Sequence, residues 1–192
     1  MYIIFDLGGV ICSFYWDKFL KSIEAVGTQP IEPKALNDLR AQLEQGKLSS
    51  FEFYKKLIAL ANADLSYDWF LELFSQYDSN LAVGDLINRI PKRYQLVLLS
   101  NTNAVHFESI FKELPVASRF SSHYLSYGVG LAKPDPKIFT LCMAELKPDS
   151  DVLFIDDSEK NVQAARQAGM VAHHYTTPFR LEHFLKINGV LT

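Results

Sequence analysis

The sequence predicts an α/β protein with a mainly parallel sheet and a helical insert after the first strand. Three observations lead to this prediction. Short apolar runs alternate with helical patterns over most of the 192 residues. Nearly every run ends in, or is soon followed by, a charged or polar residue. The stretch 14–84 breaks the alternation, since it has helical periodicity and no convincing strand.

Five short apolar runs are the expected strands, and their unbroken hydrophobicity suits strands that are buried on both faces. They span residues 2–5, 95–99, 123–125, 152–155 and 171–175. Three of these strands lead directly into Asp6, Ser100 and Asp156, and Lys133 lies in the loop that follows residue 125. Because ligands bind at the carboxyl ends of parallel strands, these polar side chains are expected to meet at one edge of the sheet.

Helices are expected between and after these strands, at residues 135–146, 159–168 and 178–187. Gly169 stands where a left-handed residue ends a helix. In the insert, Leu36, Leu39 and Leu43 form one helical stripe. A capping box at residues 49–52 begins a second helix, and aromatic residues within 70–77 mark a third.

The expected domains are therefore an α/β core of residues 1–13 and 85–192 and a helical cap of residues 14–84. Formal net charge is −3 with scattered basic residues, which predicts neither a nucleic-acid nor a membrane surface. Asp6 interrupts the first apolar run, so neither a signal peptide nor a membrane span is expected, and the predicted location is the cytoplasm. Cys12 and Cys142 are expected to be buried thiols. Nothing in the sequence predicts an oligomeric state.

Asp6 is the first candidate for chemistry. An aspartate at the end of a buried strand is costly unless something binds its charge, and a carboxylate can attack phosphorus as a nucleophile. Gly8 and Gly9 allow the backbone after it to turn tightly against a ligand. The alternative is an aspartate that only caps the following turn.

Asp156 and Asp157 are adjacent acids that repel each other unless a cation lies between them, and Mg²⁺ accepts such carboxylates. Alternatively, they are helix-start acids that the helix dipole favours. Ser100 and Asn101 offer a hydroxyl and amides to phosphate oxygens, or are ordinary turn residues. Lys133 is placed to neutralise a carboxylate and a phosphate together, or is simply solvated.

The ordered set of motifs resembles the haloacid dehalogenase superfamily of hydrolases, most of whose members are phosphatases. The matching stretches are IIFDLGGVI, VLLSNTN, GLAKPDPKIF and VLFIDDSEKNVQAARQAGM. The resemblance extends to a subgroup of bacterial sugar-phosphate phosphatases that includes glucose-1-phosphate phosphatases. It implies a Rossmann-like core, with the insert as a cap that closes over the substrate.

The resemblance also implies roles for individual residues. Asp6 is the expected nucleophile, and Lys133 pairs with it and with the phosphate. Ser100 and the Asn101 amide are the expected phosphate ligands. The expected Mg²⁺ ligands are Asp6, the Gly8 carbonyl, Asp156 and Asp157. The predicted function is hydrolysis of a small phosphorylated metabolite, a sugar phosphate by resemblance, through an aspartyl-phosphate on Asp6.

Gly8 departs from the family pattern, because most phosphatases of the family have a second aspartate there as general acid and base. Proton transfer of this kind is worth typically ~10²–10⁴-fold in rate. His106 is one candidate substitute, although a histidine on a surface helix is the simpler interpretation. Two alternatives stay open: a phosphate- or protein-binding module that has lost turnover, and a metal-independent 2-haloacid dehalogenase. The paired acids at 156–157 argue against the dehalogenase. A response-regulator receiver also uses aspartate, lysine and magnesium, but its motifs occur in the reverse order along the chain, which argues against it.

Overall fold

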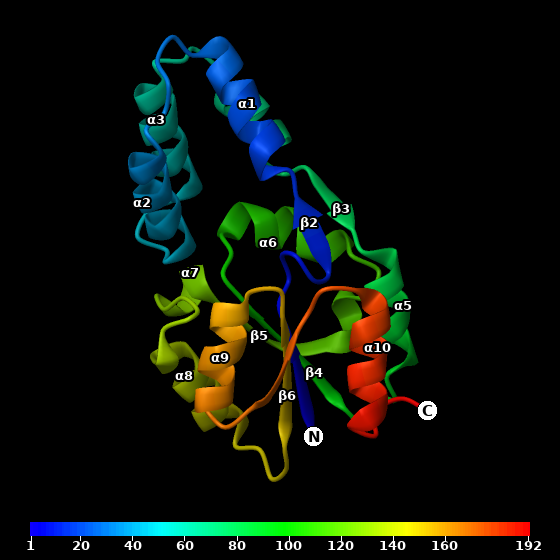
Figure 1. Ribbon diagram of the computed structural model, residues 1–192. Coiled ribbons are helices and arrows are strands. Elements are labelled where there is room, and N and C mark those ends of the chain that lie inside the picture. Colours follow the sequence, from blue (N-terminus) through cyan, green and yellow to red (C-terminus); the bar gives the residue numbers. More distant parts are fainter.

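A five-stranded parallel sheet forms the centre of the protein, in the order β5-β4-β1-β6-β7 (Figure 1). The computed structural model describes all residues, 1–192. The strands are β1 (Tyr2–Phe5), β4 (Gln95–Ser100), β5 (Phe120–Leu125), β6 (Val152–Asp156) and β7 (Val171–His174). In the centre of the sheet, Tyr2 of β1 lies opposite Gln95 of β4 and Val152 of β6. The predicted α/β fold class and its parallel sheet are confirmed.

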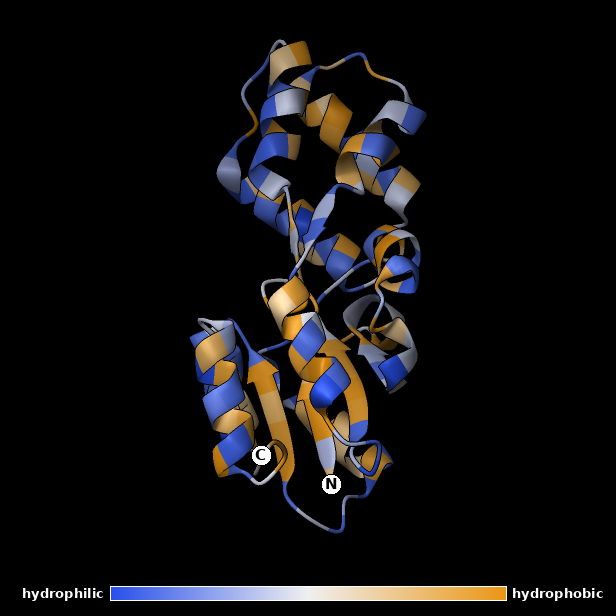
Figure 2. Ribbon diagram, turned by 90° about the vertical axis from the view of Figure 1, so that its right-hand side faces the viewer, coloured by the Kyte–Doolittle hydropathy of each residue, from blue (hydrophilic) through white to orange (hydrophobic).

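Helices cover both faces of the sheet, which explains why its central strands are apolar between their ends. Ile3 and Phe5 of β1 point to a core shared with three helices, and Ile4 points to the opposite core. The first face carries α5 (Leu81–Arg89), α6 (Ala104–Ile110) and α10 (Pro178–Ile187), and the second carries α8 (Pro136–Leu146) and α9 (Glu159–Gln167). Figure 2 shows the strands in the colours of apolar residues and the helices with mixed faces.

Four helices form a separate lobe, called the cap below, with its own hydrophobic core (Figure 1). They are α1 (Trp16–Val26), α2 (Pro33–Glu44), α3 (Ser50–Ala61) and α4 (Tyr67–Phe74). The predicted capping box is present at the start of α3, where Ser49 and Glu52 bond each other's backbone amides. The lobe joins the core through an antiparallel ribbon of β2 (Cys12–Phe14) and β3 (Tyr77–Ser79).

The lobe touches the core at a second place, where α2 approaches the short helix α7 (Ser126–Val129). Gly46 follows α2 with a φ of +68°, and a β-carbon there would overlap the backbone carbonyl of Tyr127. A residue without a side chain is therefore required at this contact. The lobe is held over the carboxyl ends of the strands from both sides.

The expected insert of residues 14–84 ends inside α5, and the division into domains stays a prediction. β3 pairs with β2 inside the supposed helical stretch, and α5 packs Val83, Leu86 and Ile87 on the sheet. The helical lobe itself runs only from α1 to α4. An amphipathic helix has the same periodicity whether it packs on a sheet or on other helices, so the pattern of α5 did not reveal its partner.

Two further sequence expectations concern the whole chain. Cys12 and Cys142 are both buried and free, as predicted. No helix combines the length and the apolar character that crossing a membrane requires.

Candidate active site

Three aspartates meet at the carboxyl edge of the sheet. Oxygen atoms of Asp6, Asp156 and Asp157 all lie within 4.8 Å of one another. The strand register brings them together, because Phe5 lies opposite Ile155 and the Asp6 amide donates to the Ile155 carbonyl at 2.9 Å. Asp6 and Asp156 are buried, whereas Asp157 is exposed. The sequence prediction that these acids converge agrees with this geometry.

Lys133 bridges two of these acids. Its completely buried ammonium lies 2.9 Å from Asp6 Oδ2 and 2.6 Å from Asp156 Oδ2. It also donates to the Leu99 carbonyl at 2.8 Å, so each of its three protons has an acceptor. Lys133 is therefore a fixed charge inside the site and not a solvated side chain.

Asn101 holds the loop that carries this lysine. Its Oδ1 accepts the Lys133 amide proton at 2.8 Å, and its Nδ2 donates to the Lys133 carbonyl at 2.8 Å. The sequence analysis considered only the Asn101 amide as a phosphate ligand and missed this role of the side chain. An asparagine after a strand is an ordinary turn residue, so no sequence signal marked it.

Asp156 is held in one orientation by several donors. Its Oδ1 accepts from the Ser158 amide and from Asn161 Nδ2, each at 2.9 Å, while its Oδ2 accepts from Lys133. Asn161 is buried in the first turn of α9, and the sequence analysis missed it. One indication of this role was present in the sequence: Asn161 is a polar residue next to Val162, on the helix face that packs on the core.

The buried cluster carries an excess of negative charge, since one ammonium faces two buried carboxylates and a third nearby. Burial raises the pKa of Asp6 to about 7; Lys133 opposes this rise and Asp156 adds to it. Burial, followed by the charge of Asp156, raises the pKa of Asp157. Burial disfavours the Lys133 ammonium, but Asp6 and Asp156 more than offset this, so the lysine pKa lies above its usual range. A bound cation would relieve the repulsion among the acids.

Ser100 ends β4, next to β1, and is buried with only 1% of its surface exposed. Its Oγ makes no hydrogen bond of normal length and angle in the protein, although Ser100 lies close enough to Asp6 to lower the pKa of that carboxyl slightly. Leaving a buried hydroxyl unpaired costs about 1–3 kcal/mol. Such a group at the sheet edge suits a ligand that supplies the missing acceptor, as a phosphate oxygen does.

The two glycines after Asp6 have different surroundings. A β-carbon at Gly8 would lie 3.1 Å from Phe14 Cε2, so the Phe14 ring stands where a side chain at position 8 would begin. Gly9 has a φ of +75°, and a β-carbon there would overlap the Asp157 carboxylate. The turn therefore lets Asp157 approach the backbone, and a side chain at position 8 would have to move the Phe14 ring by a few tenths of an ångström.

His106 does not fill the place of the missing acid, and it is not on the surface as the simpler interpretation expected. It is 7% exposed; Nε2 lies 2.8 Å from the Phe74 carbonyl and Nδ1 3.1 Å from Asn103 Nδ2. Its ring stacks on Phe14 at 4.2 Å. Burial lowers its pKa to about 4, so it is neutral at pH 7. With both nitrogens bonded, it links the cap to the core and holds Phe14 in place.

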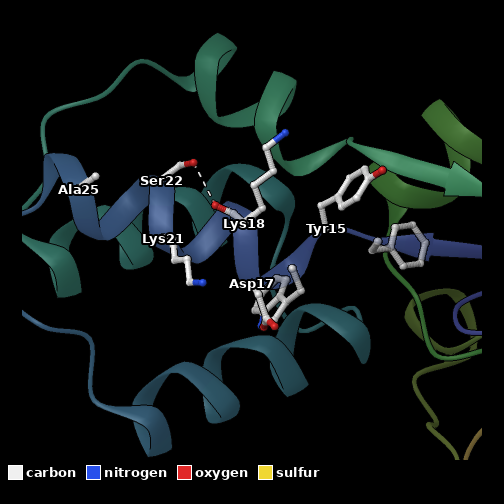
Figure 3. Close-up of a pocket in the computed structure, with 8 residues that line it drawn as sticks. Tyr15, Asp17, Lys18, Lys21, Ser22 and Ala25 are labelled. Carbon is white, nitrogen blue, oxygen red and sulfur yellow. Dashed lines mark hydrogen bonds between the residues drawn. The ribbon is translucent and has the colours of Figure 1, made fainter.

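Two hollows share Phe14 and Trp16 in their walls. A cavity of ≈ 50 Å³ between cap and core is lined by, among others, Trp16, Arg40, Glu44 and Thr102. A wide, open hollow of ≈ 700 Å³ runs along α1 from Phe14 to Ala25, and the side chains of Lys18 and Lys21 point in different directions at its wall (Figure 3). None of the three aspartates lines either hollow. Phe14 and Trp16 line both, so the open hollow adjoins the inner cavity.

Residues 1–169 match the family of haloacid dehalogenase-like hydrolases. The protein belongs to this family. A D-ribitol-5-phosphate phosphatase of Bacteroides thetaiotaomicron is 31% identical over an alignment of 183 residues, and the match covers 87% of each chain. This match and the family assignment confirm the predicted resemblance and its prediction of a hydrolase.

Solved structures of the haloacid dehalogenase-like family show the same fold. A crystal structure of the HAD family enzyme bt-2542 from B. thetaiotaomicron superposes with a TM-score of 0.86 at 26% identity, covering 96% of this chain and 97% of that one. The same enzyme in complex with magnesium and inorganic phosphate superposes with a TM-score of 0.81 at 28% identity, covering 91% and 93%. The likeness thus extends over the core and the cap.

Proposed function

We propose that this protein is a Mg²⁺-dependent phosphatase of a small phosphomonoester, a sugar or alditol phosphate, with Asp6 as its nucleophile. The observation that carries the proposal is the buried cluster of Asp6, Lys133 and Asp156 beside the unpartnered Ser100 hydroxyl. A D-ribitol-5-phosphate phosphatase among the relatives supports the substrate class. A magnesium and phosphate complex of a similar enzyme supports the cofactor.

The donor set fits magnesium. Mg²⁺ prefers oxygen ligands and is usually held by one or two carboxylates together with substrate oxygens. Asp6, Asp156 and Asp157 offer oxygens within 4.8 Å of one another, and the Gly8 carbonyl is the further proposed ligand. When bound, the ion neutralises charge on the phosphoryl group and on the carboxylates.

The residues of the chain then have distinct tasks. A carboxylate oxygen of Asp6 attacks phosphorus, and a new oxygen–phosphorus bond forms as the bond to the leaving alcohol oxygen breaks. Ser100 donates to a phosphoryl oxygen while this happens, and the buried positive charge of Lys133 attracts the phosphoryl group. A water molecule then attacks the same phosphorus, which releases phosphate and restores the Asp6 carboxylate.

The leaving oxygen must gain a proton, and the protein has no acid at position 8 to supply it. Phe14 fills the adjacent space, and both nitrogens of His106 are engaged. Slow turnover of poor leaving groups is the expected consequence. The same observation favours a second candidate function, a module that binds Mg²⁺ and phosphate without turnover.

The test is phosphate release from a panel of sugar, alditol and simple phosphomonoesters, with Mg²⁺ and with EDTA. Wild type is compared with Asp6→Asn and with the control Asp151→Asn, an exposed aspartate at the opposite end of β6. We expect metal-dependent release by wild type and the control, and none by Asp6→Asn. Binding of Mg²⁺ and beryllofluoride without any release would support the binding module instead.

A further inference from the structure

The most exposed apolar side chains of the protein lie on one flank of the core. They are Phe179, Leu81 and Ile187, which are 80%, 72% and 68% exposed, whereas no other large hydrophobic side chain exceeds 48%. All three stand on α5 and α10, which lie side by side on the same face of the sheet (Figure 1). Single exposed apolar residues are normal on a protein surface, but several on two neighbouring helices indicate a binding surface.

The two helices of this flank are fixed to each other. Asn80 precedes α5, and its Nδ2 donates to the hydroxyl of Tyr175, shortly before α10, at 2.7 Å. Farther along, Arg89 of α5 pairs with Glu182 of α10 at 2.7 Å. Both helices also pack on the same hydrophobic core. The flank is therefore already ordered, and a partner that binds it loses little conformational entropy.

A groove of ≈ 130 Å³ runs between α5 and the loop 114–116. Gly84 of α5 faces this loop, since a β-carbon there would lie 3.7 Å from Val116 Cγ1, and its lack of a side chain keeps the groove open. The apolar residues that line the groove are Ile11, Leu81, Leu114 and Val116. An apolar cavity of about 150 Å³ binds benzene, so the groove has roughly the size that a phenyl ring requires.

The free charges of the two helices are opposite in sign. Asp85 lines the groove, is exposed and has no ion pair within the protein. Arg180 directly follows Phe179 in the first turn of α10, and it is likewise exposed without an ion pair. The other charged side chains of α5 and α10 already pair with one another, and they are Arg89, Glu182 and Lys186. The groove and the start of α10 are thus complementary in charge as well as in shape.

We propose that this flank is the interface of a symmetric dimer, in which Phe179 of each copy enters the groove of the other. A twofold axis that runs along the two helices brings α5 of one copy against α10 of its partner, and the same contact forms twice. Arg180 then lies beside the partner's Asp85, and the exposed Leu81 is covered. The dimer closes on itself, because each copy uses its own groove and its own Phe179. This inference does not depend on the proposed phosphatase function.

The first test is analytical ultracentrifugation of wild type, Phe179→Ser and Gly84→Leu over a range of protein concentrations. The matched control is Phe51→Ser, which removes an exposed phenylalanine from the cap. Wild type and the control form dimers with the same Kd. The other two variants raise this Kd at least about 30-fold, because one removes the central aromatic side chain and the other fills the groove that receives it. Circular dichroism verifies that every variant is folded.

The second test exchanges the two free charges. Asp85→Arg and Arg180→Asp, each alone, place like charges together across the interface and weaken the dimer about tenfold or more. The variant that carries both substitutions restores the opposite pair and regains most of the lost affinity. A monomer at every concentration up to about 100 µM would overturn the proposal, and so would assembly that continues beyond a dimer. A double variant that associates no better than the single ones would overturn the assigned geometry.

Discussion

Replacing Asp6 by asparagine should change how the stability of the metal-free protein depends on pH. The buried cluster holds two carboxylates and one ammonium, and burial raises the pKa of Asp6 from 3.8 to about 7. Because folding raises this pKa, the Asp6 carboxyl favours the folded state most when it is protonated. Its contribution is therefore present at low pH and is lost as pH rises through about 7.

The size of the effect follows from this pKa difference. At about 1.4 kcal/mol per pH unit, the full contribution of Asp6 is about 4 kcal/mol, and about 3 kcal/mol of it is lost between pH 5 and pH 8. Asparagine does not titrate, so Asp6→Asn lacks this loss. Any hydrogen bond weakened by the substitution, such as that from the Leu7 amide to Asp6 Oδ1, contributes equally at both pH values.

The assay is urea unfolding of wild type and Asp6→Asn in EDTA at pH 5 and pH 8. Between pH 5 and pH 8, the free energy of unfolding of wild type should fall by about 3 kcal/mol more than that of the variant. Other titrating groups, His106 included, are common to both proteins and cancel in the comparison. Saturating Mg²⁺ should remove the difference, since a cation favours the ionised carboxylate. Parallel pH profiles of the two proteins in EDTA would refute the reasoning.

Three further variants test other parts of the structure. Lys133→Met leaves two buried carboxylates unpaired and should destabilise the protein by about 3–5 kcal/mol in urea unfolding; a neutral effect would contradict the cluster's charge balance. His106→Gln should abolish a loss of about 2 kcal/mol that wild type suffers between pH 7 and pH 5, because the pKa of His106 is lowered in the fold and its stabilisation disappears as pH falls from 6.5 toward 4. An unchanged pH profile would show that His106 is protonated as easily in the fold as outside it. Gly46→Ala and the control Gly189→Ala suffer similar backbone strain, at φ +68° and +70°, but only the first overlaps Tyr127. Phosphatase kcat/KM should fall ~10–100-fold in Gly46→Ala alone, because the cap must retreat by roughly an ångström; equal kinetics of the two would exclude a role for this contact in catalysis.

The central sheet was predictable because its strands are buried on both faces and so are apolar throughout. β5 shows the limit of this signal. It begins at Phe120, three residues before the predicted start. The start was missed because β5 is an edge strand and carries the exposed Ser121 and the half-buried Ser122, which interrupt the apolar pattern. The convergence of Asp6 and Asp156 followed from parallel strand ends alone, since neighbouring strands in register bring their next residues together.

The supporting residues of the site were not predictable in the same way. Asn101 and Asn161 act through side-chain bonds to Lys133 and Asp156, and these depend on how loops fold back over the sheet. His106 was interpreted as a surface histidine because its helix is short. Its hydrogen-bond partner, the Phe74 carbonyl, lies 32 residues away in the sequence, so no local pattern indicated that it is buried. Contacts between the cap and the core are long-range, and helical periodicity carries no information about them.

Trapping the covalent intermediate tests the central claim most directly. Wild type would be mixed with Mg²⁺ and its best substrate from the phosphomonoester panel, quenched in acid within the first turnovers, and digested for peptide mass spectrometry. The proposed chemistry predicts one added phosphoryl group on the N-terminal peptide at Asp6, absent from Asp6→Asn. Phosphate release without a phosphorylated Asp6, or with the phosphoryl group on another residue, would contradict it.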